Sequence, residues 1–331
     1  MRITPATPRL GRARSAGVAL VAGGAAIWGL DGVIRAPLVE DWSTWTIVLY
    51  EHVLLTLVVL PFLVTRRRAL SALTLRGWLS VGAVAWGGSA LATLAFTSAF
   101  QHGNPTVVVL LQKTQPVWAV LAAALLLGER PRRRLGVIAL PALFGVYLLS
   151  FGWMSPATAL ADGHAEPVLL ALAAAALWGG ATAFGRRALQ EVTPNVLTGL
   201  RFTVALPLLF ALAATHHGLA APAGATSGDW IRVVLVALFP GLVALVLYYR
   251  GLERVPASVA TFAELAFPAT SLLAGWVFLG AVVSVEQILG FAVVWICILA
   301  LHSDDARAPV HPPATSRRRK AVKATATAGN A

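Results

Sequence analysis

The sequence predicts an all-α integral membrane protein whose ten transmembrane helices form two inverted five-helix repeats. Three observations support this fold class. Hydrophobic residues make up 58% of the 331 residues, and charged residues make up only 12%, about half the charged share of an average soluble domain. The apolar residues form long blocks separated by short polar gaps, and motifs of the first half recur in the second half about 150 residues later.

Ten apolar segments are each long enough, at 1.5 Å per residue, to cross about 30 Å of hydrocarbon. The first is longer than the apolar stretch of a usual signal peptide, so we interpret it as a retained span. Internal Gly and Pro residues are tolerated in membrane bundles where neighbouring helices or cavities satisfy the freed backbone groups. The expected spans are residues 16–36, 44–64, 77–97, 105–127, 135–153, 166–185, 194–215, 230–249, 256–279 and 285–302.

The distribution of basic residues predicts the orientation. With the amino terminus placed in the cytoplasm, 22 of the 26 Lys and Arg residues fall on the inner side, and only Arg35 and Arg232 fall at outer ends. Membrane proteins carry such an excess of basic residues on their cytoplasmic side. We therefore expect a multi-pass protein of the plasma (cell inner) membrane with both termini cytoplasmic. The net charge of +12 then determines topology and does not indicate nucleic-acid binding.

Two pairs of motifs define the internal repeat. Trp28–Gly29 recurs as Trp178–Gly179, and Gln112–Pro116 aligns with Glu264–Pro268 at an offset of 152. Because each copy has five spans, the second copy enters the membrane from the opposite side, an architecture typical of secondary transporters. The expected segments are a basic cytoplasmic N-tail (1–15), a first five-helix repeat (16–153), an outer connecting loop (154–165), a second five-helix repeat (166–302) and a basic disordered cytoplasmic C-tail (303–331).

Two longer sequence blocks, one in each repeat, resemble those of a known transporter family. The block QPVWAVLAAALLLGERP and the block YYRGLERVPASVATFAELAFPATSLLAGWVFLG, together with the repeat, resemble the EamA-type branch of the drug/metabolite transporter superfamily over about residues 16–302. The resemblance implies an exporter or exchanger of small metabolites that works without ATP. The chain departs from the family pattern at Glu51, where many relatives carry Arg, and at Ala281, which replaces the acid of the LGE motif. Arg201 keeps the common Arg in the second copy.

Ionisable residues inside spans are functional hypotheses by default, because burying a charge in the membrane costs a few kcal/mol. Five such residues occur: Asp31, Glu51, Lys113, Arg201 and Glu264. Glu51 either lines a cavity or neutralises Lys113. Arg201 either bonds a carboxylate or helix carbonyls and locks the bundle, or serves as half of a gate or a contact for an anionic substrate group. Lys113 and Glu264 each precede a proline, and broken helices at the membrane midplane build transporter sites.

Trp28, Asp31 and Arg35 are spaced i, i+3 and i+7, so they share one helix face. Either Asp31 pairs with Arg35, or Asp31 lines a cavity and meets a cation or a proton. The deep charges comprise three acids and two bases, and a buried carboxylate without a counter-charge tends to bind a proton. One of Asp31, Glu51 and Glu264 is therefore expected to carry a coupling proton.

These arguments predict a secondary active transporter that alternates access for a small metabolite or amphipathic compound. A non-transporting scaffold or sensor and an intramembrane enzyme are the alternatives, but no catalytic motif, metal motif or cofactor-binding loop is present. The expected partners are a small-molecule solute, a proton and the lipid bilayer, with no nucleic acid, and homodimerisation is left open. Gate candidates are Glu129, which is alternatively part of a structural charge cluster, and Arg35. Candidates for substrate or coupling-ion binding are Trp28, Asp31, Glu51, Gln112, Lys113, Trp178, Arg201 and Glu264.

Overall fold

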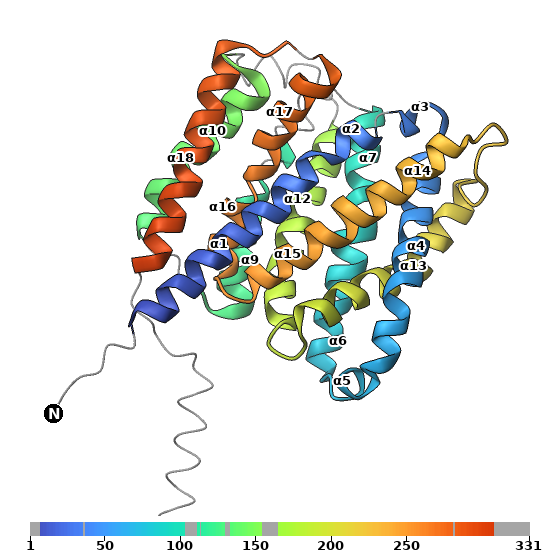
Figure 1. Ribbon diagram of the computed structural model, residues 1–331, viewed down its shortest axis with the longest axis horizontal. Helices are drawn as coiled ribbons and strands as arrows, with labels where there is room; N and C mark the ends of the chain where they lie inside the picture. The colour runs from blue at the N-terminus through green and yellow to red at the C-terminus, as the bar shows by residue number, and fades with distance from the viewer. Residues whose placement is uncertain are drawn as a thin grey trace, which may run out of the picture.

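The fold is taken from a computed structural model, which describes residues 7–35, 37–102, 111–112, 114–129, 133–153, 165–280 and 282–307. All regular secondary structure in these residues is helical (Figure 1). Up to residue 153 the elements are α1 (Thr7–Gly29), α2 (Asp31–Arg35), α3 (Leu38–Asp41), α4 (Thr44–Thr65), α5 (Arg67–Ser71), α6 (Leu75–Gly82), the π-helical η1 (Ala83–Leu91), α7 (Ala92–His102), α9 (Gln115–Leu127) and α10 (Arg133–Phe151).

The second half of the chain repeats the order of the longer helices, without counterparts of the short α2, α3 and α5. The elements are α12 (Ala165–Ala188), α13 (Pro194–Thr215), α14 (Ser227–Val236), the π-helical η2 (Ala237–Val243), α15 (Ala244–Leu252), α16 (Ala257–Ala263), α17 (Ala266–Leu279) and α18 (Val285–Arg307). Helices α4 and α13 both have 22 residues and begin 150 residues apart. Each half also places a π-helical segment in the middle of its third span.

Within the described residues, eight helical segments are long and apolar enough to cross a membrane, so the all-helical membrane fold is confirmed. The ten-span count is not reached by this measure. The expected fourth span corresponds to α9, which begins after the turn at Thr114 and has 13 residues, and residues 103–110 and Lys113 lie outside the described part. The expected fifth span corresponds to the 19-residue α10. The eight segments are Arg14–Arg35, Thr44–Thr65, Leu75–Phe96, Glu166–Ala188, Pro194–Thr215, Ser227–Leu252, Ala257–Phe278 and Val285–His302.

Helices of one repeat pack mainly against helices of the other. The largest contacts are α10 on α18, α1 on α15, α4 on α13 and α9 on α12, and each of these pairs joins the two halves of the chain (Figure 1). The main apolar core contains buried side chains from both halves, among them Val21, Leu55, Leu197 and Leu252. The space between the repeats is therefore the middle of the molecule.

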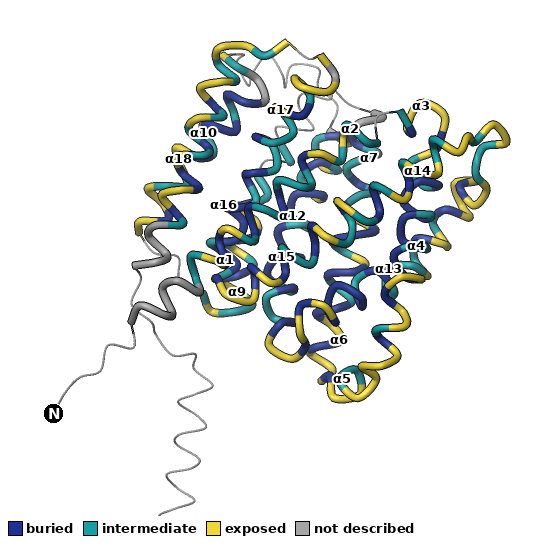
Figure 2. Tube along the Cα trace, in the orientation of Figure 1, coloured by how far each residue is buried: buried dark blue, intermediate teal, exposed yellow. Residues whose placement is uncertain are grey.

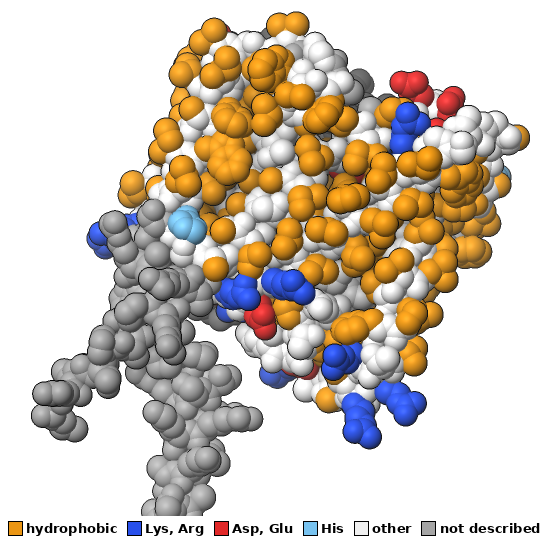
Figure 3. Space-filling view, viewed as in Figure 1, with side chains coloured by type: hydrophobic (Ala, Val, Ile, Leu, Met, Phe, Trp, Pro, Cys, Tyr) orange, Lys and Arg blue, Asp and Glu red, His pale blue; other side chains and the backbone are white. Residues whose placement is uncertain are grey.

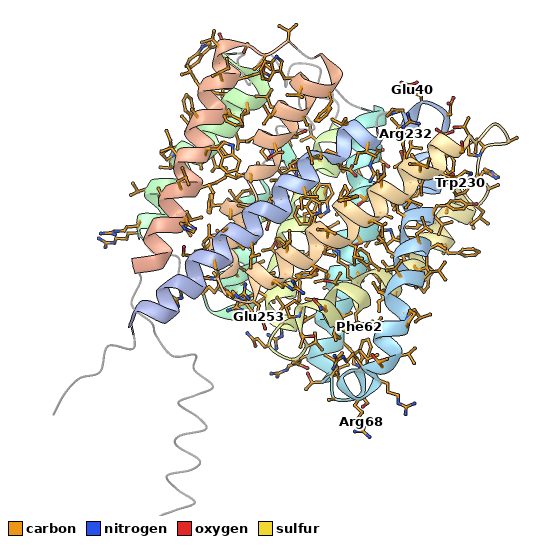
Figure 4. The ribbon with its side chains drawn as sticks, viewed as in Figure 1. Glu40, Phe62, Arg68, Trp230, Arg232 and Glu253 are labelled. Atoms are coloured by element: carbon orange, nitrogen blue, oxygen red, sulfur yellow. The ribbon has the colours of Figure 1, made fainter. Side chains whose placement is uncertain are left out.

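The outer surface carries large apolar side chains, as expected for helices that face lipid. Leu125 is 85% exposed and Leu140 is 73% exposed, and exposed residues follow the outside of the bundle in Figure 2. Figure 3 shows an apolar face with basic side chains gathered near its lower edge. We call that end, which carries Arg66–Arg68 and Glu253, the basic end. Glu40 and Arg232 lie at the opposite end (Figure 4), together with Asp41, which follows Glu40, and Asp229, which pairs with Arg232; we call this the acidic end.

Helix breaks occur where the sequence predicted them. Between α16 and α17 the chain turns at Glu264 and Leu265, with the Leu265 N–H donating to Phe262 at 3.2 Å. The corresponding turn before α9 lies at Thr114, whose N–H donates to Leu111 at 3.0 Å. A proline follows each turn and cannot donate a backbone hydrogen bond, so the polar groups before it need other partners. Both breaks open toward the interior between the repeats.

Candidate functional site

A cavity of about 560 Å³ lies between the two repeats. Its lining reaches Val39 and Thr44, toward the acidic end, and includes none of the residues that define the basic end. Lys113 lies outside the described residues, and Glu129 does not line the cavity. The other predicted candidates, together with Arg35, all line it: Trp28, Asp31, Glu51, Gln112, Trp178, Arg201 and Glu264.

Arg35 joins the two carboxylates on the acidic-end side of the cavity. Its Nε donates to Asp31 Oδ2 at 2.6 Å and its Nη2 to Asp31 Oδ1 at 2.9 Å, a bidentate pair across one helical turn. Its Nη1 donates to Glu51 Oε1 at 2.6 Å. The predicted Asp31–Arg35 pair is thus present in the structure. Among the described residues, the ion-pair partner of Glu51 is Arg35.

Glu264 sits at the break between α16 and α17 and is bonded by neutral groups from three other helices. The hydroxyl of Tyr248 donates to Oε1 at 2.9 Å, and the hydroxyl of Thr182 lies 3.3 Å from the same oxygen. The amide of Gln115 donates to Oε2 at 2.9 Å and in turn accepts from Gln112 at 3.1 Å. Within the described residues, no cation forms an ion pair with Glu264. Its carboxyl group is therefore the cavity acid without a direct counter-charge.

Arg201 also binds neutral groups. Its Nε donates to the Ser89 hydroxyl at 2.8 Å, its Nη1 to the Tyr249 hydroxyl at 3.0 Å, and its Nη2 to the Gly88 carbonyl at 3.3 Å. No carboxylate of the described residues lies within ion-pair distance of this guanidinium. Of the alternatives given for Arg201, the structure shows a hydrogen bond to a helix carbonyl and none to a carboxylate of the described residues. The guanidinium also places a positive charge on the cavity wall.

The two Trp–Gly motifs form the same inter-repeat contact twice. The indole N–H of Trp28 donates to the carbonyl of Pro240 in η2 at 2.9 Å, and that of Trp178 donates to the carbonyl of Gly88 in η1 at 2.9 Å. A π-helical turn disturbs the regular carbonyl ladder and offers such acceptors. Each motif therefore connects the first helix of one repeat to the widened third helix of the other.

The glycine of each motif allows a close backbone approach. A Cβ on Gly29 would lie 2.8 Å from the Phe267 carbonyl oxygen, and a Cβ on Gly179 would lie 2.8 Å from the Gln115 carbonyl oxygen. Both contacts fall immediately after the helix breaks. The two glycines therefore allow the first helix of each repeat to pack closely against the broken helix of the other repeat.

His52 lies beside Glu51 and packs inside the bundle. It is buried, and its Nδ1 lies 2.9 Å from the Val48 carbonyl of its own helix. Its ring packs edge-on against Phe202 at 5.7 Å between centroids. Its Nε2 has no hydrogen-bond partner among the described residues, and the side chain contributes to the cavity wall.

The sequence analysis missed Tyr248, Tyr249 and Thr182, which form three of the six hydrogen bonds described above for Glu264 and Arg201. Neutral hydroxyl residues are common in membrane helices, so their presence alone gave no signal. Glu129 lies at the basic end, where its carboxylate accepts from the backbone N–H groups of Ala257 and Ser258 at 3.0 and 3.1 Å.

Comparisons with known proteins agree with the resemblance found in the sequence motifs. Residues 15–151 and again residues 166–302 match the EamA-like transporter family. The chain is 32% identical over 292 residues to the Riboflavin transporter ImpX of Fusobacterium nucleatum, covering 86% of this chain and 97% of that protein. It is 28% identical over 212 residues to the Uncharacterized transporter YwfM of Bacillus subtilis, covering 63% of this chain and 68% of that protein.

A solved protein crystal structure superimposes with a TM-score of 0.70 and covers 89% of this chain and 100% of its own, at 21% identity, which indicates a shared fold. Within the described residues, no group of three His, Cys, Asp or Glu side chains is arranged to hold a metal ion. The two family matches correspond to the two halves that build the cavity. The chain therefore belongs to the EamA-like transporter family and is a multi-pass membrane transporter.

Proposed function

We propose that this protein is a secondary active transporter whose solute binds in the cavity between the repeats. The observation that carries the proposal is the position of the cavity: its walls come from both halves of the chain, and it is lined by four of the five predicted intramembrane charges, Asp31, Glu51, Arg201 and Glu264. Rocking one repeat against the other would expose such a site to each side of the membrane in turn. A non-transporting scaffold would not need charged and aromatic groups of both repeats around one space.

The proposed solute is a small planar heteroaromatic compound with a polar edge. The cavity volume falls within the roughly 300–1,000 Å³ of typical small-molecule sites. Trp28, Trp178 and Phe96 provide aromatic surface, and Gln112 and Gln115 provide amide donors and acceptors. Riboflavin is the first candidate, because it combines a planar ring system and an imide edge with a hydroxylated chain, and because the relative ImpX is named as its transporter.

We further propose that Glu264 carries a coupling proton. Asp31 and Glu51 share Arg35 and so have a counter-charge, whereas the hydrogen bonds to Glu264 come from neutral groups. A carboxyl group in such surroundings gains or loses a proton without breaking an ion pair. Of the three acids expected to carry the proton, Glu264 is therefore the one we select. Arg201, on the same cavity wall, is proposed to contact an electron-rich group of the solute.

The proposed topology has ten spans in two inverted repeats, with α9 and α10 completing the first five. The capping residues Thr74 and Thr226 support the inversion, because they begin equivalent helices 152 residues apart and lie at opposite ends of the bundle. The excess of basic residues supports a cytoplasmic basic end in the plasma membrane, with both termini on that side.

The proposal is tested by flux measurements on purified protein in liposomes. Riboflavin movement, followed by its fluorescence, is measured in both directions with and without an imposed pH gradient, and a panel of other heteroaromatic solutes is tested by competition. We expect export or exchange that responds to the pH gradient. In Glu264→Gln the response to the gradient should disappear, and Arg201→Ala should lower the flux about tenfold, as expected for loss of a charged contact.

Glu166→Gln is the matched control, because it makes the same chemical change in an exposed acid outside the cavity and should leave flux unchanged. If the unmodified protein transports solutes and the flux of every one of them is independent of the pH gradient, the proposed proton coupling is contradicted. Absence of flux for the whole panel, in protein that remains folded, would contradict the proposed solute class.

A further inference from the structure

Two carboxylates at the basic end cap helices that belong to the opposite repeat. Glu191, in the turn after α12 in the second repeat, accepts from the backbone N–H and the hydroxyl of Thr74, at 2.9 Å and 2.8 Å. Thr74 is the N-cap residue of α6 in the first repeat. Gly77 makes room for this approach, since a Cβ there would overlap the Glu191 carboxylate. The first cap thus runs from the second repeat to the first.

The second cap runs in the other direction. Glu129 follows α9 in the first repeat, and its carboxylate accepts from the N–H groups of Ala257 and Ser258 and from the Ser258 hydroxyl at 2.9 Å. These residues begin α16, the helix that ends at Glu264. Hydrogen bonds to an ionised acceptor are about twice as strong as neutral ones. The basic end is therefore held closed by two reciprocal, charge-assisted contacts between the repeats.

The acidic end has a different arrangement at the equivalent positions. Thr226 corresponds to Thr74 and caps α14, but its carboxylate partner is Asp229 of the same helix, at 2.8 Å from the Thr226 N–H. Asp229 stands at the position equivalent to Gly77. Asp41 is equivalent to Glu191, and its side chain is exposed and has no hydrogen-bond partner among the described residues. The cap at this end therefore closes within one repeat.

The counterpart of the second cap is also missing from the sequence. The position equivalent to Glu129 holds Ala281, which has no carboxylate, and the position equivalent to Ala257 holds Pro105, which has no backbone N–H. Neither the acceptor nor one of its donors is encoded for the acidic end. The two ends of the bundle therefore differ at both pairs of equivalent caps: each cross-repeat cap of the basic end lacks its counterpart at the acidic end.

We propose that Glu129 and Glu191 are the gating residues of the transport cycle, and that both cross-repeat caps break when the cavity opens to the basic end. This inference rests on the proposed function, in which the repeats rock against each other. In the part of the chain that the structure describes, no equivalent cross-repeat cap would have to break for the acidic end to open, which fits the reach of the cavity lining toward Val39 and Thr44. The protein therefore rests with its basic end closed. A solute entering or leaving through that end must offset the loss of both caps.

The test uses cysteine accessibility in protein reconstituted in lipid nanodiscs, where both faces are open to reagent. In a Cys297→Ala background, Ala260→Cys reports on the basic end, because Ala260 lies in α16 and is fully buried. Thr44→Cys reports on the acidic side of the cavity. The labelling rate with a water-soluble maleimide is measured in Glu129→Gln, Glu191→Gln and the double variant.

Each single variant should raise the labelling rate of the Ala260→Cys reporter about tenfold, as expected for loss of a hydrogen bond to a charged group. The double variant should raise it further and should slow labelling of the Thr44→Cys reporter, because opening one end closes the other. Asp229→Asn is the control: it weakens a cap of the same kind inside one repeat and should leave both rates unchanged.

Unchanged rates in the double variant would overturn the proposal. An equal rise in the Asp229→Asn control, or faster labelling at both reporters, would overturn it as well, since either result means general loosening. Labelling requires no solute, so this result is independent of the proposed solute class. If solute flux is observed but labelling does not change, Glu129 and Glu191 are not gating residues, and the protein is still a transporter. If labelling changes but no tested solute is transported, the two caps do hold the basic end closed, and the proposed transport is contradicted.

Discussion

At Arg35, one guanidinium holds two carboxylates from different helices, each at 2.6 Å. Arg35 is about 25% exposed and Glu51 about 10% exposed, so the cluster is only partly shielded from solvent. Without the guanidinium, two negative charges would face each other inside the bundle. Arg35 therefore contributes to stability by balancing charge as well as by forming hydrogen bonds.

We predict that Arg35→Gln lowers the free energy of unfolding by about 2 kcal/mol, below the 3–5 kcal/mol for breaking a fully buried pair because solvent reaches this one. The measurement is thermal unfolding of purified protein. Adding Glu51→Gln to the first change should restore part of the loss, because the unpaired carboxylate is then removed. A double variant less stable than Arg35→Gln alone would show that the ion pair is not the cause.

Sequence spacing identified the residues of the site better than their partners. The i, i+4 spacing correctly indicated the Asp31–Arg35 pair, since both residues lie one helical turn apart. The second partner of Arg35 was not foreseen, because contact with Glu51 depends on how α2 folds back toward α4 after the end of α1. Contacts between helices are set by packing, and spacing along one helix does not encode them.

At the scale of helices, the Trp–Gly motifs hold the broken helices in place. Gly179 lies against the backbone of α9 just after its break, and a Cβ would approach Ala119 N to 2.7 Å. Backbone atoms cannot move aside as a flexible side chain does. The contact therefore depends on the absence of a side chain at this position.

We predict that Gly179→Ala destabilises the protein by about 1–3 kcal/mol, the usual cost of overpacking. Gly180→Ala is a matched control on the next residue of the same helix, where a Cβ meets nothing within 4 Å. It should leave stability unchanged or raise it by up to about 1 kcal/mol, since Ala favours helix over Gly. Thermal unfolding of the two variants side by side checks the difference, and equal melting temperatures would contradict the close-packing argument.

The element-level predictions from the sequence succeeded where proline gave a local signal. The breaks before Pro116 and Pro268 lie where those residues indicated, because a missing N–H acts on its immediate neighbours. The π-helical turns η1 and η2 were not predicted. Only η2 contains a proline, and η1 shows no comparable feature apart from Gly87, Gly88 and Ser89. The indole contacts that use these turns were therefore also missed.

For the whole molecule, the core lies between the repeats more than within either one. The principal helix pairs all join the two halves, and the cavity takes its walls from both. A single repeat would leave apolar and charged surface of this interface without a partner. The repeat offset indicated two related halves, but it did not indicate how closely they interlock.

We predict that residues 1–153 and residues 166–331, expressed as separate chains, are each unstable alone and form a stable complex together. The chosen boundaries leave out the predicted connecting loop and keep every described helix intact except for Ala165 at the start of α12. Size-exclusion profiles of fluorescently tagged fragments give the measurement. A monodisperse, thermally stable single fragment would contradict a core shared between the halves.

The difference between Gly77 and Asp229 has a consequence for how a duplicated protein acquires direction. Two identical halves give a symmetric machine in which neither side of the membrane is preferred. Three residues after a shared threonine cap, Asp229 caps its own helix, whereas Gly77 leaves the space that Glu191 of the other half fills. A few codon differences between the halves of a duplicated gene can thus give the two ends of the bundle different kinds of helix cap, one joining the halves and one within a half.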